Sequence, residues 1–209
     1  MSTVLTVAAT PSAAGLVLRP WEPGDAGALV EAYRDPAMRH WQTERVGGVE
    51  DAERWLEAQR LGRESGDRLG FAVYEAPREA PYGSRLVAGA MLKRTAAGPG
   101  ALEAGYWTVA GARGRGVASR ALGALTAWAF EAFAADGLER IELLHQMDNA
   151  ASCRVAEKTG YALERILPAA PPAFPLDGHL HVRRARSGVL GVRSQGLSSC
   201  GRREFDGRP

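Results

Sequence analysis

The chain has 209 residues, of which 45% are hydrophobic, so it is long enough for one enzyme-sized domain with a sizeable core. Its formal charge of +2 is unevenly distributed, because residues 183–209 carry +5 and residues 1–182 carry −3. A nucleic-acid-binding protein normally carries its basic residues on the folded part of the chain, so nucleic-acid binding is disfavoured here.

Two cysteines, Cys153 and Cys200, are too few for a disulfide framework, which favours a reduced, cytoplasmic setting. The first residues, MSTVLTVAATPSAAG, contain no basic leader, and no stretch reaches the ~18 apolar residues of a membrane span. We therefore expect a cytoplasmic protein without a membrane partner.

Composition divides the chain into three parts. Residues 1–15 are expected to be a flexible N-terminus, residues 16–186 a folded domain, and residues 187–209 a basic tail. The tail is rich in Gly, Ser and Arg and lacks apolar periodicity, which predicts disorder.

The first half of the domain predicts two helices and then strands. A strand is expected over 16–21, and Asp25 is a candidate N-cap for a helix that runs to about Tyr33. Apolar residues at helical spacing predict a second helix over roughly 49–61. The runs 68–76, 85–95 and 101–109 are separated by turn sequences, which is typical of an antiparallel meander.

The second half returns to helical periodicity at Gly116, where an apolar stripe suited to packing on a sheet begins. A buried strand is expected over 140–145, followed by a short helix over 149–161 with Asn149 as its cap. Strands at about 161–167 and 179–185 close the domain around a proline-rich loop.

The stretch ARGRGVASRAL, residues 112–122, lies between the strand that ends near Val109 and the helix that starts near Gly116. Free amides at the start of a helix and its positive dipole end favour an anion. Glycines permit close approach of the backbone, and Arg113 and Arg115 can donate paired hydrogen bonds to phosphate oxygens. The sequence therefore predicts a phosphate site at this loop.

Two familiar phosphate loops fit poorly. A Walker loop would end in Gly-Lys-Ser/Thr, whereas this chain continues Gly116, Val117, Ala118, Ser119. The dinucleotide fingerprint would place a third small residue, usually Gly or Ala, where this chain has Ser119, and it occurs after a strand of a parallel sheet. The strands before this loop are expected to be antiparallel, so dinucleotide binding remains the weaker alternative.

Arg113, Gly116 and Ala118 fill the pattern Arg/Gln-x-x-Gly-x-Gly/Ala, which resembles the acetyl-CoA pyrophosphate loop of the GNAT superfamily of N-acetyltransferases. The segments GYWTVAGARGRGVASRAL and ERIELLHQMDNAASCRVAEKTGY are similar to the Rim-type branch, which acetylates N-terminal amines of ribosomal proteins. The resemblance covers roughly 16–185. It implies an α/β GNAT fold, with a mixed central sheet, an antiparallel N-terminal meander and helices on both faces.

The resemblance also implies a cofactor site. In this family the strand before the loop and the strand after the helix splay apart, and pantetheine lies between them. An amide near Val109 would support the thioester oxygen, worth roughly 3 kcal/mol where the donor is well placed. The residues expected to bind acetyl-CoA are Trp107, Thr108, Val109, Arg113, Gly114, Arg115, Gly116, Val117, Ala118, Ser119, Asn149 and Ser152.

Two residues are candidates for the chemistry. Glu103, in the stretch LEAGYW, is the expected acceptor of the amine proton, directly or through water. Many superfamily members donate a proton to the leaving thiolate from a tyrosine seven residues after the Asn of the second motif, but Ala156 stands there. Ser152 matches the serine of Rim-type enzymes and is the candidate donor; an ordinary first-turn serine is the alternative.

No metal is expected. His179 and His181 alternate along one strand, yet no Cys, Asp or Glu partner lies at a recognisable metal-ligand spacing. His145 is a candidate second base, although a structural histidine fits as well, and Cys153 is expected to pack rather than react.

The resulting hypothesis is transfer of an acetyl group from acetyl-CoA to a primary amine, either a protein N-terminus or a small amine. The mildly acidic body favours a cationic acceptor. A non-catalytic acyl-CoA-binding regulatory module is the main alternative because of Ala156, and an RNA-associated protein using the arginine-rich tail is a third. A homodimer is the candidate assembly.

Truncation after Ser187 is predicted to leave kcat/KM for acetyl transfer within a few-fold of the full chain, because the tail has no apolar periodicity with which to join a core. Steady-state kinetics on both forms provide the measurement. Loss of folding or activity would show that the tail docks on the domain.

Overall fold

The computed structural model describes residues 3–41, 44–76, 85–95, 98, 100–172 and 174–185. The tail and Cys200 lie outside the described residues. Within the described ranges, no helix is long and apolar enough to cross a membrane.

One sheet of eight strands, in the order β1-β2-β3-β4-β5-β6-β8-β7, organises the domain. Among the strands of the described residues, only β5 and β6 pair in parallel, and the other neighbours are antiparallel. The predicted mixed sheet with an antiparallel meander is confirmed. The strands are β1 (Leu5–Val7), β2 (Gly15–Pro20), β3 (Arg68–Ala76), β4 (Arg85–Arg94), β5 (Ala101–Thr108), β6 (Arg140–Gln146), β7 (Ala162–Leu167) and β8 (Gly178–Arg184).

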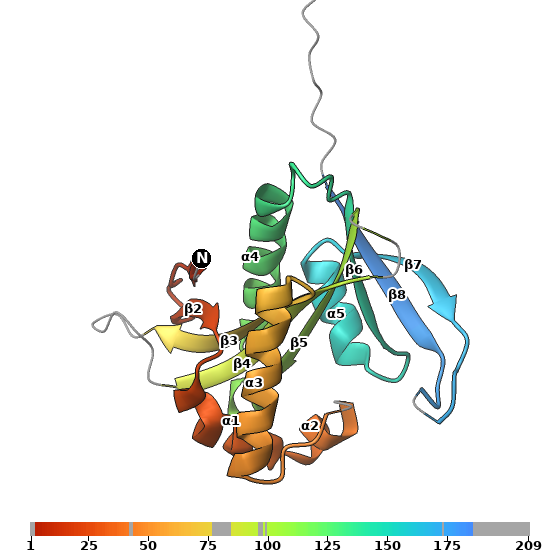
Figure 1. Ribbon diagram of the computed structural model, residues 1–209. Coiled ribbons are helices and arrows are strands. Elements are labelled where there is room, and N and C mark those ends of the chain that lie inside the picture. Colours follow the sequence, from red (N-terminus) through yellow and green to blue (C-terminus); the bar gives the residue numbers. More distant parts are fainter. Residues whose placement is uncertain are drawn as a thin grey trace, which may run out of the picture.

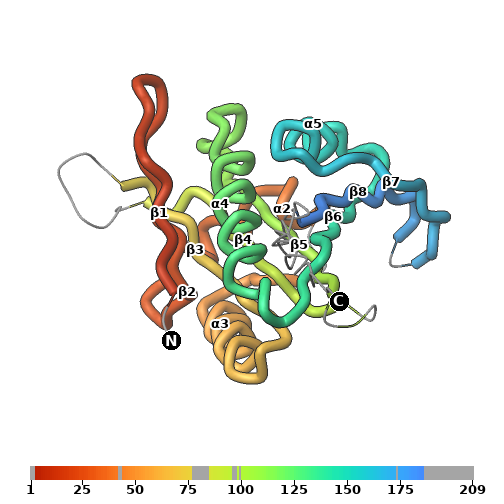
Figure 2. The backbone as a smooth tube through the Cα atoms, turned by 90° about the horizontal axis from the view of Figure 1, so that it is seen from above, coloured from red at the N-terminus to blue at the C-terminus, as the bar shows by residue number. Residues whose placement is uncertain are grey.

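Helices cover both faces of this sheet, as predicted. Figure 1 shows α3 in front of the strands, and Figure 2 shows it on the face opposite α4 and α5. The helices are α1 (Ala26–Tyr33), α2 (Pro36–Trp41), α3 (Val49–Ser65), α4 (Val117–Ala132) and α5 (Ala150–Lys158), with single 3₁₀ turns η1 (Pro23–Asp25) and η2 (Ala110–Ala112).

The larger core lies between the sheet and α4. The predicted apolar stripe of α4 includes Val117, Ala121 and Leu125, all of which are buried against strand residues such as Phe71. A buried hydrogen bond of 2.6 Å joins the hydroxyls of Thr126 and Tyr161, so α4 is also tied to the segment after α5. The start of α4 is therefore held firmly over the sheet.

Two elements were not predicted. Strand β1 pairs with β2, and Arg120 of α4 donates hydrogen bonds of 2.7 Å to the carbonyls of Ala8 and Ala14. The first fifteen residues, expected to be flexible, therefore contain an edge strand bonded to the sheet and to α4. Helix α2 was also missed, because six residues are too few to show a period.

Asp25 stands at the N-cap position of α1, as predicted, but its side chain does not make the capping hydrogen bond. The carboxylate instead accepts bonds from both Nη atoms of Arg19, at 2.9 and 2.7 Å, and from the hydroxyl of Tyr74 at 2.6 Å. The backbone amide of Glu22 donates a further bond. Burial raises the pKa of the Asp25 carboxyl, but the bonds from Arg19 and Tyr74 outweigh it and hold that pKa below its usual value.

Asp25 thus fixes the start of α1 to β2 and β3 through a buried carboxylate. Asp25→Ala is predicted to lower the free energy of unfolding at pH 7 by about 3 kcal/mol, because it leaves Arg19 without its buried partner. Since the carboxyl pKa is lowered on folding, this contribution is present above about pH 4 and is lost as pH falls further.

Urea unfolding at pH 7 and pH 3 measures both effects. Glu57→Gln is the control, because Glu57 pairs with Arg60 on the exposed side of α3, where solvent screens the pair and its contribution to stability is small. An equal loss in the two variants at pH 7 would contradict the role given to Asp25.

Candidate active site

Pairing between β5 and β6 stops partway along the two strands. The last register pair is Ala104 with Leu143, although β5 continues to Thr108 and β6 to Gln146. Backbone groups of β5 beyond Ala104 that would have bonded to β6 are therefore left facing a gap. This gap is the splay that the sequence resemblance implied.

A cavity of about 470 Å³ lies at the gap, between α2, the end of β5, the loop into α4, β6 and α5. Most of the predicted cofactor residues line it, although they come from three separate segments of the chain. They are Trp107, Thr108, Arg113, Gly114, Gly116, Val117, Ala118, Ser119, Asn149 and Ser152. Val109 and Arg115 do not.

The loop before α4 depends on two glycines. Gly114 and Gly116 have φ angles of 73° and 75°, in the left-handed region that side chains rarely adopt. The first hydrogen bond of α4 runs from the Arg120 amide to the Gly116 carbonyl at 3.1 Å, so the amides of Val117, Ala118 and Ser119 precede the helical ladder. These amides can bind an anion in the cavity.

The two loop arginines point in different directions. Arg113 lines the cavity and forms an ion pair with Asp35, between α1 and α2. Arg115 pairs instead with Glu75 on β3 and lies outside the cavity. Of the two, Arg113 is the one placed to reach a phosphate there.

The backbone groups of Trp107, Thr108 and Val109, which were expected to contact the cofactor, also point in different directions. The Val109 amide donates to the Val87 carbonyl of β4 at 3.0 Å, so it is not a free donor for a developing oxyanion. Successive residues of a strand direct their amides to opposite edges. The Thr108 amide therefore faces the gap, whereas the Trp107 backbone, like that of Val109, faces β4.

Ser152 is positioned by the start of α5. As predicted, Asn149 caps this helix: its side-chain oxygen accepts a hydrogen bond from the Ser152 amide at 3.2 Å. The Ser152 hydroxyl lies 2.9 Å from the Tyr106 hydroxyl, across the gap on β5. Burial raises the pKa of Tyr106, which keeps its proton at neutral pH.

Tyr106 was not among the predicted site residues. The family resemblance placed the proton-donating tyrosine at position 156. Ala156 stands there instead, fully buried in the core, and carries no functional group. The signal that could have found Tyr106 is strand alternation: Ala104, Tyr106 and Thr108 point to the same face, toward α4 and α5.

A second cavity of about 170 Å³ lies on the α3 side of the sheet and contains Glu103. The Glu103 carboxylate is 2.9 Å from the Lys93 ammonium and is 24% exposed. The two cavities share four lining residues at the gap, namely Tyr106, Trp107, Leu144 and Ser152. Glu103 and Ser152 therefore border neighbouring cavities that share these four residues as a common wall.

Tryptophans form much of the second cavity's wall. The ring of Trp21 stacks on Trp107 at 5.9 Å between centroids and contacts Trp55 edge-on at 5.0 Å. Trp107 lies close over Gly89, where a Cβ atom would come within 2.5 Å of its ring. The Trp55 indole donates to Glu44, so an acidic group accompanies Glu103 along this wall.

His145, the candidate second base, lines the larger cavity, but both of its ring nitrogens have partners within the protein. Its Nδ1 lies 2.8 Å from the Gln146 carbonyl, and its Nε2 lies 3.6 Å from the Cys153 sulfur. Burial lowers its pKa and that of His181. Both rings are therefore neutral at pH 7.

Similarity to known proteins agrees with this geometry. Residues 15–162 match the family described as the acetyltransferase (GNAT) domain. No match is found among curated protein sequences.

Three solved structures share the fold at low sequence identity. RimJ from Mycobacterium smegmatis, in complex with CoA-disulfide, is 22% identical with a TM-score of 0.67, over 88% of this chain and 87% of that chain. A ribosomal-protein-S5-alanine acetyltransferase from Vibrio fischeri is 16% identical with a TM-score of 0.68, over 88% and 96%. The microcin C7 self-immunity acetyltransferase MccE, in complex with acetyl-CoA and AMP, is 16% identical with a TM-score of 0.68, over 84% and 98%.

The family match spans more than half of the chain and includes β5, the glycine loop, α4, β6 and α5, which together build the larger cavity. The chain therefore belongs to the GNAT family of acetyltransferases.

Proposed function

We propose that the protein transfers the acetyl group of acetyl-CoA to a primary amine by direct attack, with the cofactor in the larger cavity and the acceptor in the smaller one. The observation that carries this proposal is the meeting of the two cavities at the gap between β5 and β6. An acyl donor and an amine that enter from opposite faces of the sheet would meet there, which supplies the proximity that a two-substrate reaction needs.

The larger cavity suits a pyrophosphate followed by a pantetheine arm. The pyrophosphate would lie on the amides of residues 114–119, with Arg113 as a charged donor. The pantetheine amides would bond to the strand edge left open by the splay. The Thr108 amide then replaces Val109 as the donor to the thioester oxygen while negative charge develops on it.

The proposed chemistry uses groups on both sides of the gap. The acceptor nitrogen attacks the thioester carbon, and its proton passes to Glu103 directly or through water. The carbon–sulfur bond then breaks, and the thiolate of CoA takes a proton from the hydroxyl pair of Ser152 and Tyr106. The pair regains a proton from solvent, and Glu103 releases to solvent the proton that it accepted. The products are an N-acetylated amine and the CoA thiol.

The smaller cavity suits a cationic acceptor. Trp21, Trp55 and Trp107 present aromatic rings, which attract ammonium groups. The carboxylates of Glu44 and Glu103 are paired with Arg68 and Lys93, and an acceptor ammonium would compete with these basic groups for them. A structural neighbour described as modifying the N-terminal serine of a ribosomal protein favours a protein N-terminus, and the MccE complex with AMP favours a small-molecule acceptor. Release of CoA, assayed with a panel of N-terminal peptides, polyamines and amine antibiotics, distinguishes the two.

The same assay tests the rival function of a non-catalytic acyl-CoA-binding module. That rival rested on Ala156, and the Ser152–Tyr106 pair supplies hydroxyls at the gap without a tyrosine at 156. Binding of acetyl-CoA without CoA release for every acceptor would favour the rival.

Acetyl-CoA is predicted to raise the Tm, and Gly116→Asp is predicted to remove that increase. The substitution forces a side chain into a left-handed backbone position and places negative charge against the pyrophosphate. Thermal unfolding with and without acetyl-CoA provides the measurement. The matched control is Gly66→Asp, because Gly66 has the same φ of 75° but lies at the end of α3, away from the larger cavity.

Gly66→Asp should be destabilised to a similar extent and keep its full response to acetyl-CoA. An unchanged response in Gly116→Asp would place the phosphate site elsewhere.

Glu103→Gln is predicted to lower kcat roughly 10²-fold at neutral pH, the lower end of general-base effects. The deficit should shrink as pH rises, because free amine accumulates near the acceptor's own pKa of ~8 for an N-terminus or ~10.4 for a lysine. Ser152→Ala and Tyr106→Phe should each cost less, because a thiolate leaves without full protonation. The pH dependence of kcat for each variant is the measurement.

The matched control is Glu142→Gln. Glu142 is the register partner of Glu103 on β6, but it pairs with Arg140 and borders neither cavity. Every variant must retain the acetyl-CoA shift in Tm. A large loss of kcat in Ser152→Ala, together with a nearly unchanged kcat in Glu103→Gln at neutral pH, would overturn the assignment of Glu103 as the base.

A further inference from the structure

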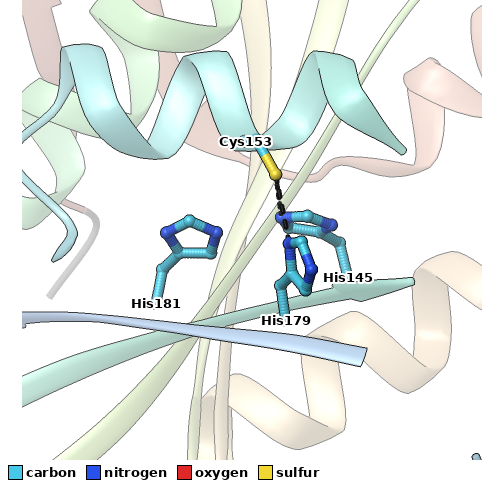
Figure 3. Close-up of side chains that lie close together, drawn as sticks. All are labelled: His145, Cys153, His179 and His181. Carbon is cyan, nitrogen blue, oxygen red and sulfur yellow. Dashed lines mark hydrogen bonds between the residues drawn. The ribbon is translucent and has the colours of Figure 1, made fainter. Parts of the chain in front are cut away.

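Three of the chain's four histidines and one of its two cysteines gather at one point beneath α5. Figure 3 shows Cys153 descending from α5 toward His145 on β6 and toward His179 and His181 on β8. One potential ligand atom from each residue lies within 4.8 Å of the others.

The sheet register explains how these residues come together. His145 and His179 are direct cross-strand partners in the antiparallel pair of β6 and β8. His181 follows His179 by two residues and so points to the same face, which α5 covers. Cys153 lies in the first turns of α5 and faces this row. The absence of a metal was expected because no partner showed ligand spacing along the chain, but the fold supplies partners from three elements.

We propose that His145, Cys153, His179 and His181 bind one zinc ion. In a tetrahedral site with Zn–N of about 2.0 Å and Zn–S of about 2.3 Å, two nitrogen ligands are separated by roughly 3.3 Å and a nitrogen and a sulfur by roughly 3.5 Å. The Cys153 sulfur lies 3.2 Å from His179 Nδ1 and 3.6 Å from His145 Nε2, which is close to this spacing. All four ligand atoms lie within 4.8 Å of one another, so the cluster would contract around the ion to reach bonding distances.

Hydrogen bonds on the far side of two rings prepare them as ligands. His145 Nδ1 can donate to the Gln146 carbonyl at 2.8 Å, and His181 Nδ1 can donate to the Tyr161 carbonyl at 3.4 Å. In that tautomer the Nε2 lone pair of each ring faces the cluster, as in other histidine sites whose orientation is fixed by an outer partner. The His181 Nε2 is buried, and among the described residues it has no hydrogen-bond partner.

An unpaired buried nitrogen is costly unless something binds it, and a metal ion at the centre of the cluster would do so. Three imidazoles and a thiolate suit zinc, which accepts nitrogen and sulfur ligands together. Binding releases the thiol proton of Cys153 and leaves the site with a net charge of +1. Four protein ligands leave no open position, so the ion is structural rather than a catalyst.

The ion would link the first turns of α5 to β6 and β8. Cys153 is adjacent to Ser152, so this link would also fix the helix that carries the serine at the cofactor cavity. The inference concerns metal binding and does not depend on acetyl transfer, since it is tested without acetyl-CoA or an amine.

Metal analysis of the purified full chain after incubation with zinc and removal of free metal is the first test, with about one zinc ion expected per chain. Free zinc at 100-fold above its Kd should raise the Tm by roughly 5–10 °C. Replacement of zinc by Co²⁺ should give a charge-transfer absorption that requires a thiolate ligand.

Matched variants identify the ligands. Cys153→Ser and His181→Gln should each lose the bound zinc and the cobalt–thiolate absorption. Cys200→Ser and His40→Gln should keep both, because these are the chain's other cysteine and histidine and neither belongs to the cluster.

Zinc should also protect Cys153 from alkylation in the Cys200→Ser chain, where it is the sole thiol. This measurement and the cobalt spectrum need no cluster variant and hold even if one fails to fold. Wild-type protein that retains no zinc, or zinc retained equally by Cys153→Ser and Cys200→Ser, would overturn the proposal.

Discussion

The site depends on one interruption of the sheet: β5 and β6 pair as far as Ala104 and Leu143 and then separate. A parallel pair normally satisfies its backbone groups along its full length, so separation leaves polar edges that need other partners. The extended backbone of a ligand can supply them. The gap also crosses the whole sheet, which is why Tyr106, Ser152 and Glu103 reach a common region although they lie over different faces.

The two faces that the gap connects have different characters. On the α4 and α5 side, backbone amides and Arg113 provide positive potential, because two glycines allow the chain to turn sharply into α4. On the α3 side the wall holds tryptophans and two carboxylates, Glu44 and Glu103, which are paired with Arg68 and Lys93. Gly89 contributes indirectly, since the absence of a side chain lets the Trp107 ring lie close to β4. In the proposed reaction, the anionic donor would use the side with free amides, and the amine would use the side with aromatic rings.

Local patterns predicted much of this arrangement, and long-range contacts account for what they missed. The strands, α4 and the Asn149 cap follow from periodicity and from residues within one helical turn of each other. The predicted capping bond of Asp25 was wrong because its carboxylate binds Arg19 on β2 and Tyr74 on β3, which a pattern for the start of a helix does not include. Tyr106 and Ser152 lie 46 residues apart, and the cysteine–histidine cluster joins three elements, so no spacing along the chain could have indicated either contact. The short elements β1 and α2 contain too few residues to establish a period.

The ion pair between Arg113 and Asp35 has a consequence for the order and speed of turnover. Asp35 also accepts a hydrogen bond from the Ala37 amide at 3.0 Å, so it holds the start of α2, whose residues Ala37, Met38 and Trp41 border the larger cavity. A phosphate that takes Arg113 competes with Asp35, which lowers its net gain in free energy and shortens its residence time. If the proposed cofactor binds at Arg113, Asp35 would act as an internal competitor that helps to release the CoA product, and the loss of its partner would make the position of α2 sensitive to whether the cofactor is bound.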